Sequence, residues 1–200
     1  MKKYRLTEET TKVGNRTLYR IQALRDFGNV KEGDIGGYIE SEKNLSQDGN
    51  AWVYGNARVY GNACVYGNAR VYGNARVYGD AWVSGNACVY GDACVYGDAW
   101  VSDNACVYGD AWVSDNARVY GDADIKTTGD ICSMSGFGSE YRTTTAFRTK
   151  NGDVHVSCGC FQGNLEAFCQ RVESTHGNNL YGREYKKMIE MLKIHFEVEP

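Results

Sequence analysis

A six-residue repeat occupies the middle of this 200-residue chain and restricts its fold more than any other feature. From Ala51 to Gly121 the sequence reads A-x-V-Y/S-G/D-N/D, and only the second letter varies widely, among Arg, Cys and Trp. A short repeat of this kind is a structural unit that buries its apolar residues by stacking on copies of itself. The repeat therefore predicts a solenoid.

The order of letters inside each repeat indicates how one unit is built. Residues two apart in a strand face the same side, so A-x-V places Ala and Val in the interior and the variable letter outside. The Gly-Asn and Gly-Asp pairs tolerate the left-handed backbone of a tight turn. Short strands with a turn every six residues predict three flat faces, with eighteen residues per coil.

This pattern resembles the hexapeptide-repeat family, whose members form left-handed parallel β-helices. At the N-terminal end, "DFGNVKEGDIGGYIE" followed by "NLSQDGNAWVY" resembles the start of YdcK-like proteins, which are β-helix proteins of unassigned activity. We expect an N-terminal β cap over residues 1–35, because the end of a solenoid exposes strand edges and an open core. The left-handed β-helix is expected over residues 36–138.

The last segment, residues 139–200, predicts a separate α+β module. Asn151-Gly152 is a strong hairpin signal between two strands. Asn164 and Gly177 have the residue types that begin and end a helix, and a second amphipathic helix follows. The resulting ββαα unit, with "CGCF", resembles small C-terminal modules of repeat proteins in phage and prophage genomes.

Charge and composition exclude some classes of partner and indicate a compartment. A net charge of −3 and a pI near 5.7 argue against general nucleic-acid binding. The start "MKKYRLTEETTK" lacks the apolar run of a signal peptide, and no stretch approaches the ~18 apolar residues of a membrane span. We therefore expect the cytoplasm of the producing or infected bacterial cell, where the eight cysteines stay reduced.

With eighteen residues per coil, the outward letters form three ladders, which offer candidate binding surfaces. The third face carries Trp82 and Trp100, an exposed aromatic strip of the kind that favours burial against another chain. The ladders either stiffen flat sheets or form an interface, and the resemblance to hexapeptide-repeat proteins implies a homotrimer. The remaining candidate contact residues lie on the second face: Arg58, Arg76, Tyr60 and Tyr78.

The candidates for chemistry all follow the solenoid. The hexapeptide acyltransferases that the coils resemble place a catalytic His in or near the coil, whereas the three histidines here come later. His155, Cys158 and Cys160 are weak candidates for a metal site, since C-x-C departs from the usual zinc spacing; the alternative is a pair of packed cysteines. A further candidate is a Cys-His pair in which Cys160 or Cys169 is the nucleophile and His176 its partner.

The sequence alone thus favours a non-enzymatic binding or scaffold protein, with no catalytic residue and no cofactor. It would be phage- or prophage-encoded, with counter-defence as one version, and would bind a host protein or a nucleotide-type small ligand through the outer faces and the C-terminal module. The alternative is an enzyme, acyltransferase-like or hydrolytic, with its site between the last coil and the C-terminal module.

Overall fold

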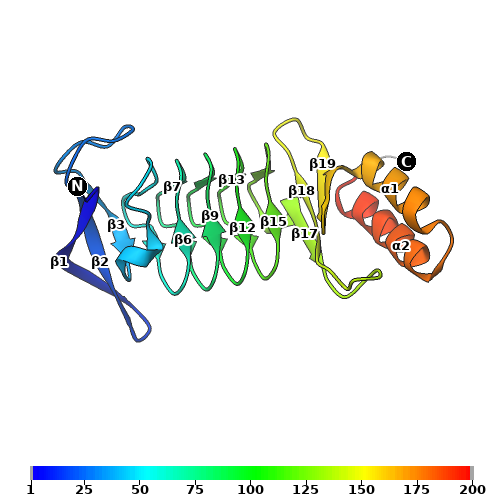
Figure 1. The fold of residues 1–200 in the computed structure, drawn as a ribbon, viewed down its shortest axis with the longest axis horizontal. Coiled ribbons are helices and arrows are strands. Elements are labelled where there is room, and N and C mark those ends of the chain that lie inside the picture. The colour runs from blue at the N-terminus through cyan, green and yellow to red at the C-terminus, as the bar shows by residue number, and fades with distance from the viewer. Residues whose placement is uncertain (1, 199–200) are drawn as a thin grey trace.

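A computed structural model describes residues 2–198 and shows an elongated molecule with three parts in line (Figure 1). An antiparallel hairpin lies at one end, a parallel β-helix of about five coils fills the middle, and a small sheet with two helices lies at the other end. The fold class expected from the repeat, a mainly β solenoid with an N-terminal β segment and C-terminal helices, is confirmed.

Each repeat forms one two-residue strand, and equivalent strands of successive coils pair in parallel on three faces. The first face comprises β4 (Trp52–Val53), β7 (Arg70–Val71), β10 (Cys88–Val89), β13 (Cys106–Val107) and β16 (Asp124–Ile125). The second face comprises β5 (Arg58–Val59), β8 (Arg76–Val77), β11 (Cys94–Val95) and β14 (Trp112–Val113). The third face comprises β6 (Cys64–Val65), β9 (Trp82–Val83), β12 (Trp100–Val101) and β15 (Arg118–Val119). The registers join residues eighteen apart, as the sequence predicts.

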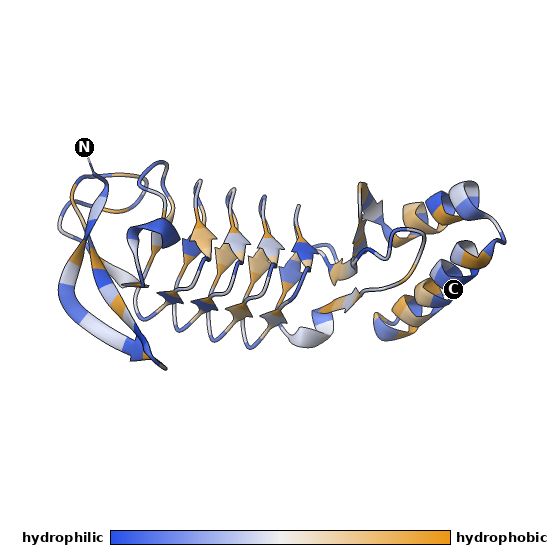
Figure 2. Ribbon diagram, turned by 60° about the horizontal axis from the view of Figure 1, so that its bottom comes forward, coloured by the Kyte–Doolittle hydropathy of each residue, from blue (hydrophilic) through white to orange (hydrophobic). Residues whose placement is uncertain are grey.

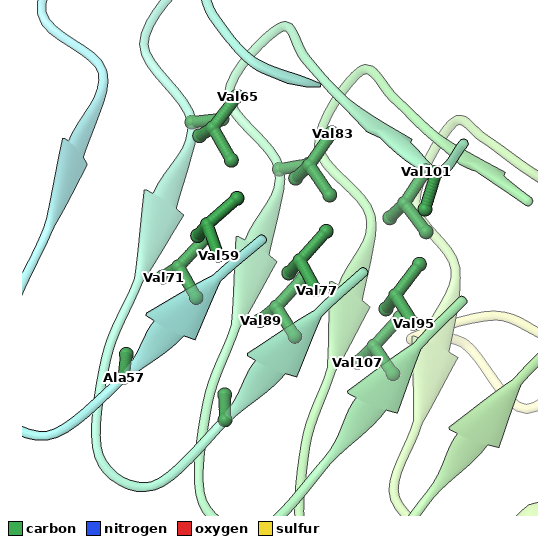
Figure 3. Packing of buried hydrophobic residues seen from close by; sticks show 14 of the residues in the cluster. Ala57, Val59, Val65, Val71, Val77, Val83, Val89, Val95, Val101 and Val107 are labelled. Atoms are coloured by element: carbon green, nitrogen blue, oxygen red, sulfur yellow. The ribbon is translucent and has the colours of Figure 1, made fainter. Parts of the chain in front are cut away.

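The interior of the β-helix consists of the repeated Val and Ala side chains. Every Val from Val53 to Val113 and every Ala from Ala51 to Ala111 is fully buried. Figure 3 shows that Val59, Val77 and Val95 of successive coils form one row, with parallel rows from the other two faces. Burial of one such side chain stabilises the fold by roughly 1.5–3 kcal/mol, so the coil stack is held mainly by this column.

The corners are tight and are joined along the rod by side-chain amides. At one corner Asn50, Asn68, Asn86 and Asn104 each donate from Nδ2 to the residue eighteen positions later, at 3.0–3.4 Å. Most corners use a glycine with positive φ, whereas Asp103 takes the same conformation with φ 58°. An L-residue pays a steric cost there, which Asp tolerates better than most.

The N-terminal segment closes one end of the core. Its strands are β1 (Tyr4–Val13), β2 (Arg16–Ala23) and β3 (Ile35–Ile39), followed by the 3₁₀ turn η1 (Glu42–Asn44). β3 pairs antiparallel with β2 and parallel with β5, so it joins the hairpin to the coils. Trp52, which the ladder pattern places outside, is only 1% exposed because the rings of Tyr4 and Phe27 pack edge-on against it.

The other end is closed by a four-stranded antiparallel sheet. Its strands are β17 (Ile131–Met134), β18 (Thr144–Arg148), β19 (Val154–Cys158) and β20 (Phe161–Asn164), preceded by the 3₁₀ turn η2 (Thr128–Asp130). The β-helix was expected to continue to residue 138, but β17 pairs antiparallel with β18, so parallel stacking ends at β16. Phe147 packs into the open end of the coil core, whereas Ala146 faces the helices.

Two helices cover the outer side of this sheet: α1 (Leu165–His176) and α2 (Leu180–His195). Asn164 caps α1 by accepting from the backbone N–H of Ala167 at 2.8 Å, and Gly177 ends it, as the sequence predicts. Both helices carry apolar and polar segments (Figure 2), and their apolar residues form a second core with the sheet. Over residues 2–198, neither helix has the length and apolar character that crossing a bilayer requires.

Candidate functional site: the junction groove

Two adjoining hollows lie where the last coil meets the C-terminal module; together they are called the junction groove here. The first, the apolar recess, has a volume of about 230 Å³ and is walled by Phe161, Phe168 and Val172. The second, the polar recess, has a volume of about 490 Å³ and reaches the coil at Asn116 and Arg118. Glu140, Arg142 and Gly159 border both hollows.

Three reactive side chains from different elements meet in the apolar recess. His176, at the end of α1, stacks on the ring of Tyr185 in α2, with centroids 5.6 Å apart and planes at 29°. The Tyr185 hydroxyl lies 3.7 Å from the Sγ of Cys158 at the end of β19. Thr144 Oγ1 donates to the same sulfur at 3.1 Å. In the groove an imidazole therefore contacts a phenol, and the phenol contacts a thiol.

The Tyr185 hydroxyl is kept neutral by its surroundings. Burial, followed by the hydrogen bond with Cys158, raises the pKa of this phenol above its usual value. Gly138 packs directly against the Tyr185 hydroxyl, with no room for a side chain there, and its backbone N–H donates to Glu184 at 2.9 Å. The loop over the recess thus fixes the position of the phenol.

The groove is positively charged, although the chain as a whole is negative. Three arginines border it: Arg118 from the last coil, Arg142 from the loop before β18 and Arg171 from α1. Glu140 is the acidic residue among the lining residues of both recesses, and its carboxylate lies 3.9 Å from Arg142. An excess of guanidinium groups with an apolar hollow beside them suits a ligand that is anionic at one end and apolar at the other.

The three weak metal candidates are not brought together. His155 lies on the sheet face toward the coil, with its ring 6.3 Å from Phe147, whereas Cys158 packs with the helix core on the opposite face. The cause is alternation: residues three apart in one strand point to opposite sides. Cys160 is exposed in the turn between β19 and β20, so it does not share a strand face with Cys158. Within residues 2–198, no cluster of three His, Cys, Asp or Glu could hold a metal ion.

The two candidate Cys-His pairs have different outcomes. Cys160 and His176 both line the apolar recess, so the structure brings this pair to one site. Cys169 instead lines a separate surface hollow with Lys186 and Ile189. Cys158 is the cysteine with a defined hydrogen-bond environment in the recess, and the sequence did not single it out as a nucleophile.

The six outward candidates divide between two faces. Trp82 and Trp100 pair on the third face, with 46% and 38% of their surfaces exposed and their ring centroids 5.8 Å apart. Arg58 and Arg76 pair on the second face, where Tyr60 and Tyr78 stack at 5.0 Å. The homotrimer, like a host-protein or nucleotide-type partner, stays a prediction.

The family-model match to known proteins lies in the repeat region. Three overlapping segments, residues 51–67, 57–70 and 69–85, match the family model described as the YdcK β-solenoid repeat. The coils carry YdcK-type repeats. A protein of Escherichia coli (strain K12) named "Uncharacterized acetyltransferase YdcK" is 40% identical over 62 residues. That match covers 27% of this chain and 19% of the relative, so it spans about a fifth of YdcK.

The resemblance to YdcK-like proteins is thereby confirmed, with the family-model match over residues 51–85, and neither comparison shows a phage-type C-terminal module. The function expected from the sequence was wrong. We expected a non-enzymatic scaffold or binding protein of phage origin, but the matched relative is named as an enzyme, an acetyltransferase. The expectation failed because the lack of a histidine on the coils was taken as evidence against acyl transfer, so an enzyme site after the last coil was kept only as the alternative.

The alternative expected from the sequence placed an enzyme site between the last coil and the C-terminal module, where the junction groove lies, but most residues of the groove were missed. Tyr185 falls in the second amphipathic helix expected from the sequence, and nothing in the sequence marks Arg142 or Thr144 as site residues. Arg118 was one letter of a ladder and looked like any other repeat position. One feature of the sequence did indicate the site: every histidine follows residue 150, in the separate module that meets the coils.

Proposed function

We propose that this protein is an acyltransferase that transfers an acetyl or similar small acyl group at the junction groove. The observation that carries the proposal is the position of His176, which stacks on Tyr185 in an apolar recess that opens beside three arginines. The name of the E. coli relative supports the reaction class, although the match lies in a short segment.

The donor is an acyl thioester that carries phosphate groups. Arg118 and Arg142 border the polar recess, where guanidinium groups suit bidentate contact with phosphate. The acyl end then lies in the apolar recess against Phe161 and Phe168, whose ring centroids are 5.2 Å apart. The 230 Å³ volume of this recess favours a short acyl group over a long one.

The chemical step assigns one role to each reactive side chain. The hydroxyl or amine of the acceptor attacks the thioester carbonyl, and His176 takes the proton that the acceptor loses. Tyr185 donates its hydroxyl hydrogen to the oxyanion that develops, which requires the neutral phenol that its raised pKa maintains. The carbon–sulfur bond then breaks, and the imidazolium returns the proton to the departing thiolate.

A covalent route through Cys158 is the second candidate, favoured by the contact between this thiol and the Tyr185 hydroxyl. In that route the Cys158 sulfur attacks the thioester carbonyl, the carbon–sulfur bond to the donor breaks, and the donor thiol leaves with the proton that Cys158 loses. The acceptor then attacks the acyl-Cys158 thioester, and its proton passes to the Cys158 sulfur as that carbon–sulfur bond breaks. Mass spectrometry after incubation with acetyl-CoA alone distinguishes the routes, since only the covalent route leaves an acetyl group on Cys158.

The test uses acetyl-CoA as the probe and titration calorimetry as the measurement. Arg142→Gln is expected to weaken binding by about tenfold or more, which corresponds to ~1.4 kcal/mol. Arg76→Gln is the matched control, because Arg76 is an exposed arginine on the second face outside the groove. The proposal fails if the wild-type protein does not bind acetyl-CoA, or if both variants weaken binding equally.

Turnover is tested with a panel of small hydroxyl and amine acceptors and detection of acetylated product by mass spectrometry. His176→Gln is expected to lower kcat by two to four orders of magnitude, on the order of a general base. His195→Gln is the control, since His195 hydrogen-bonds the backbone carbonyl of Gly129 outside the groove.

We place the reaction in the bacterial cytoplasm, where eight unpaired cysteines persist.

A further inference from the structure

Cys88 and Cys106 face outward at the same position of consecutive coils. They are register partners in the first face, where β10 pairs in parallel with β13. Val89 and Val107, the next residue in each strand, point into the core in one row (Figure 3), so both cysteines lie on the outer side. No other pair of cysteines in the described strands occupies paired register positions on one face.

The two thiols also have the same side-chain conformation. Cys88 Sγ lies 3.7 Å from the carbonyl oxygen of Asn86, and Cys106 Sγ lies 3.8 Å from that of Asn104. Asn86 and Asn104 are themselves one coil apart, so the position of the Cys106 thiol is that of the Cys88 thiol shifted by one coil. The two sulfurs are therefore separated by about the strand spacing, ~4.8 Å.

The environment of Cys88 favours a negative sulfur at a partly protected site. Arg70, one coil before Cys88, donates from Nη2 to Cys88 Sγ at 3.3 Å. Cys88 is 6% exposed, whereas Cys106 is partly exposed and leaves a route from solvent. Cys94 provides a contrast on the second face, since it is equally buried but lies between Arg76 and Trp112 and has no second sulfur beside it.

We propose that Cys88 and Cys106 bind one Cu(I) ion in two-coordinate geometry, with the ion between the two sulfurs. Two metal–sulfur bonds of ~2.3 Å placed end to end span ~4.6 Å, which matches the separation that the coils impose. Thiolate ligands select soft ions such as Cu(I). Zinc requires four ligands, and no third His, Cys, Asp or Glu in the described part of the chain completes such a group here.

The site is independent of acyl transfer, because it lies on the coils and shares no residue with the junction groove. Its rigidity comes from the same Val column that holds the coils together, so the two sulfurs are positioned before the ion arrives. Such preorganisation lowers the cost of binding.

The test is an anaerobic competition between the purified protein and bathocuproine disulfonate for Cu(I), read from the absorbance of the chelator complex. Cys88→Ser and Cys106→Ser are each expected to lower the Cu(I) stoichiometry by one equivalent. Cys94→Ser is the matched control and is expected to retain the full stoichiometry. Circular dichroism verifies that each variant keeps the β-helix.

A double Cys158→Ser/Cys160→Ser variant tests the other cysteines that are close in sequence, and it is expected to retain the coil site. In that variant, X-ray absorption at the copper edge is expected to show two sulfur neighbours. The proposal is overturned if Cys88→Ser leaves the stoichiometry unchanged, if Cys94→Ser loses the same equivalent, or if the double variant binds no Cu(I).

Discussion

The guanidinium carbon of Arg118 lies 5.5 Å from the centroid of the Trp100 ring, and the same arginine borders the polar recess. Trp100 in turn contacts Trp82 one coil earlier. The exposed strip of the third face is therefore continuous with the junction groove, and whatever covers the strip lies next to the site.

We propose that the third face is the contact between three copies of the chain. Exposed Trp82 and Trp100 side chains provide apolar area that a second copy would bury. Replacement of both by Ser is expected to convert a trimer into a monomer in light scattering, with an unchanged circular dichroism spectrum.

Trp112→Ser is the control for this prediction, because Trp112 is 52% exposed but lies on the second face. A wild-type protein that stays monomeric at high concentration, or a Trp112→Ser variant that dissociates as readily, contradicts the assignment of the third face.

Replacement of Tyr185 by Phe is expected to lower kcat for acyl transfer by about 10²-fold, with little change in KM. The phenol hydrogen acts on charge that develops during the reaction, so its loss affects turnover more than binding. Tyr181→Phe is the control, since Tyr181 contacts the His176 ring from outside the recess. A rise in KM with an unchanged kcat would indicate that Tyr185 only shapes the pocket.

The corner glycines allow a comparison that separates backbone strain from coil stacking. Gly79 and Gly121 have similar φ angles, 74° and 62°, but a Cβ on Gly79 would lie 2.9 Å from the backbone N of Gly97. A Cβ on Gly121 meets nothing within 4 Å. Both alanine variants incur the left-handed penalty of roughly 1–2 kcal/mol, and Gly79→Ala adds the clash.

We therefore expect urea denaturation to give a lower unfolding free energy for Gly79→Ala than for Gly121→Ala. Equal values for the two variants would mean that the coils separate locally at little cost.

Cys88 is expected to ionise below the range of an ordinary thiol. The adjacent Cys106 thiol, followed by the hydrogen bond and charge of Arg70, lowers the pKa of Cys88 from 9.0 to about 6, against the opposing effect of burial, and the same pairing raises the pKa of Cys106. Thiolate absorbance at 240 nm is expected to show a step near pH 6 that Cys88→Ser removes and Arg70→Gln shifts upward. Arg76→Gln, which changes the equivalent contact at Cys94, is the control.

The same pKa has a consequence for stability with a definite sign. A thiol with a lowered pKa in the folded state contributes stability that is fully present above its unfolded pKa and is lost as the pH falls toward 6. The urea midpoint is expected to rise more between pH 6 and 8 in the wild-type protein than in Cys88→Ser. An equal rise in both would contradict the lowered pKa.

The repeat made the coils predictable to the level of single side chains, because one period determines the strand, the corner and the register together. The assignments failed where contacts come from outside the period. Trp52 is buried by Tyr4 and Phe27, which the repeat does not contain, and Cys88 is covered by its ladder neighbours. β17 leaves the β-helix because antiparallel pairing with β18 competes with another coil.

The residues that meet in the junction groove, unlike its place after the last coil, were inaccessible to sequence reasoning for a related reason. Cys158, His176 and Tyr185 come from a strand and two helices, and their meeting depends on how these elements pack over the sheet. The helix caps at Asn164 and Gly177 were predictable because they depend on a few adjacent residues. Features that depend on adjacent residues were therefore predictable from the sequence, whereas the meeting of side chains from three elements was not.

Since every coil is an eighteen-residue copy of its neighbour, the length of the molecule can change in whole steps. Removal of residues 75–92 would join Asn74 to Ala93 in the correct phase and shorten the rod by one strand spacing, ~4.8 Å. The two closing segments would meet the same kind of coil surface as before. The repeat thus acts as an adjustable spacer, which sets how far the N-terminal hairpin stands from the junction groove without altering either one.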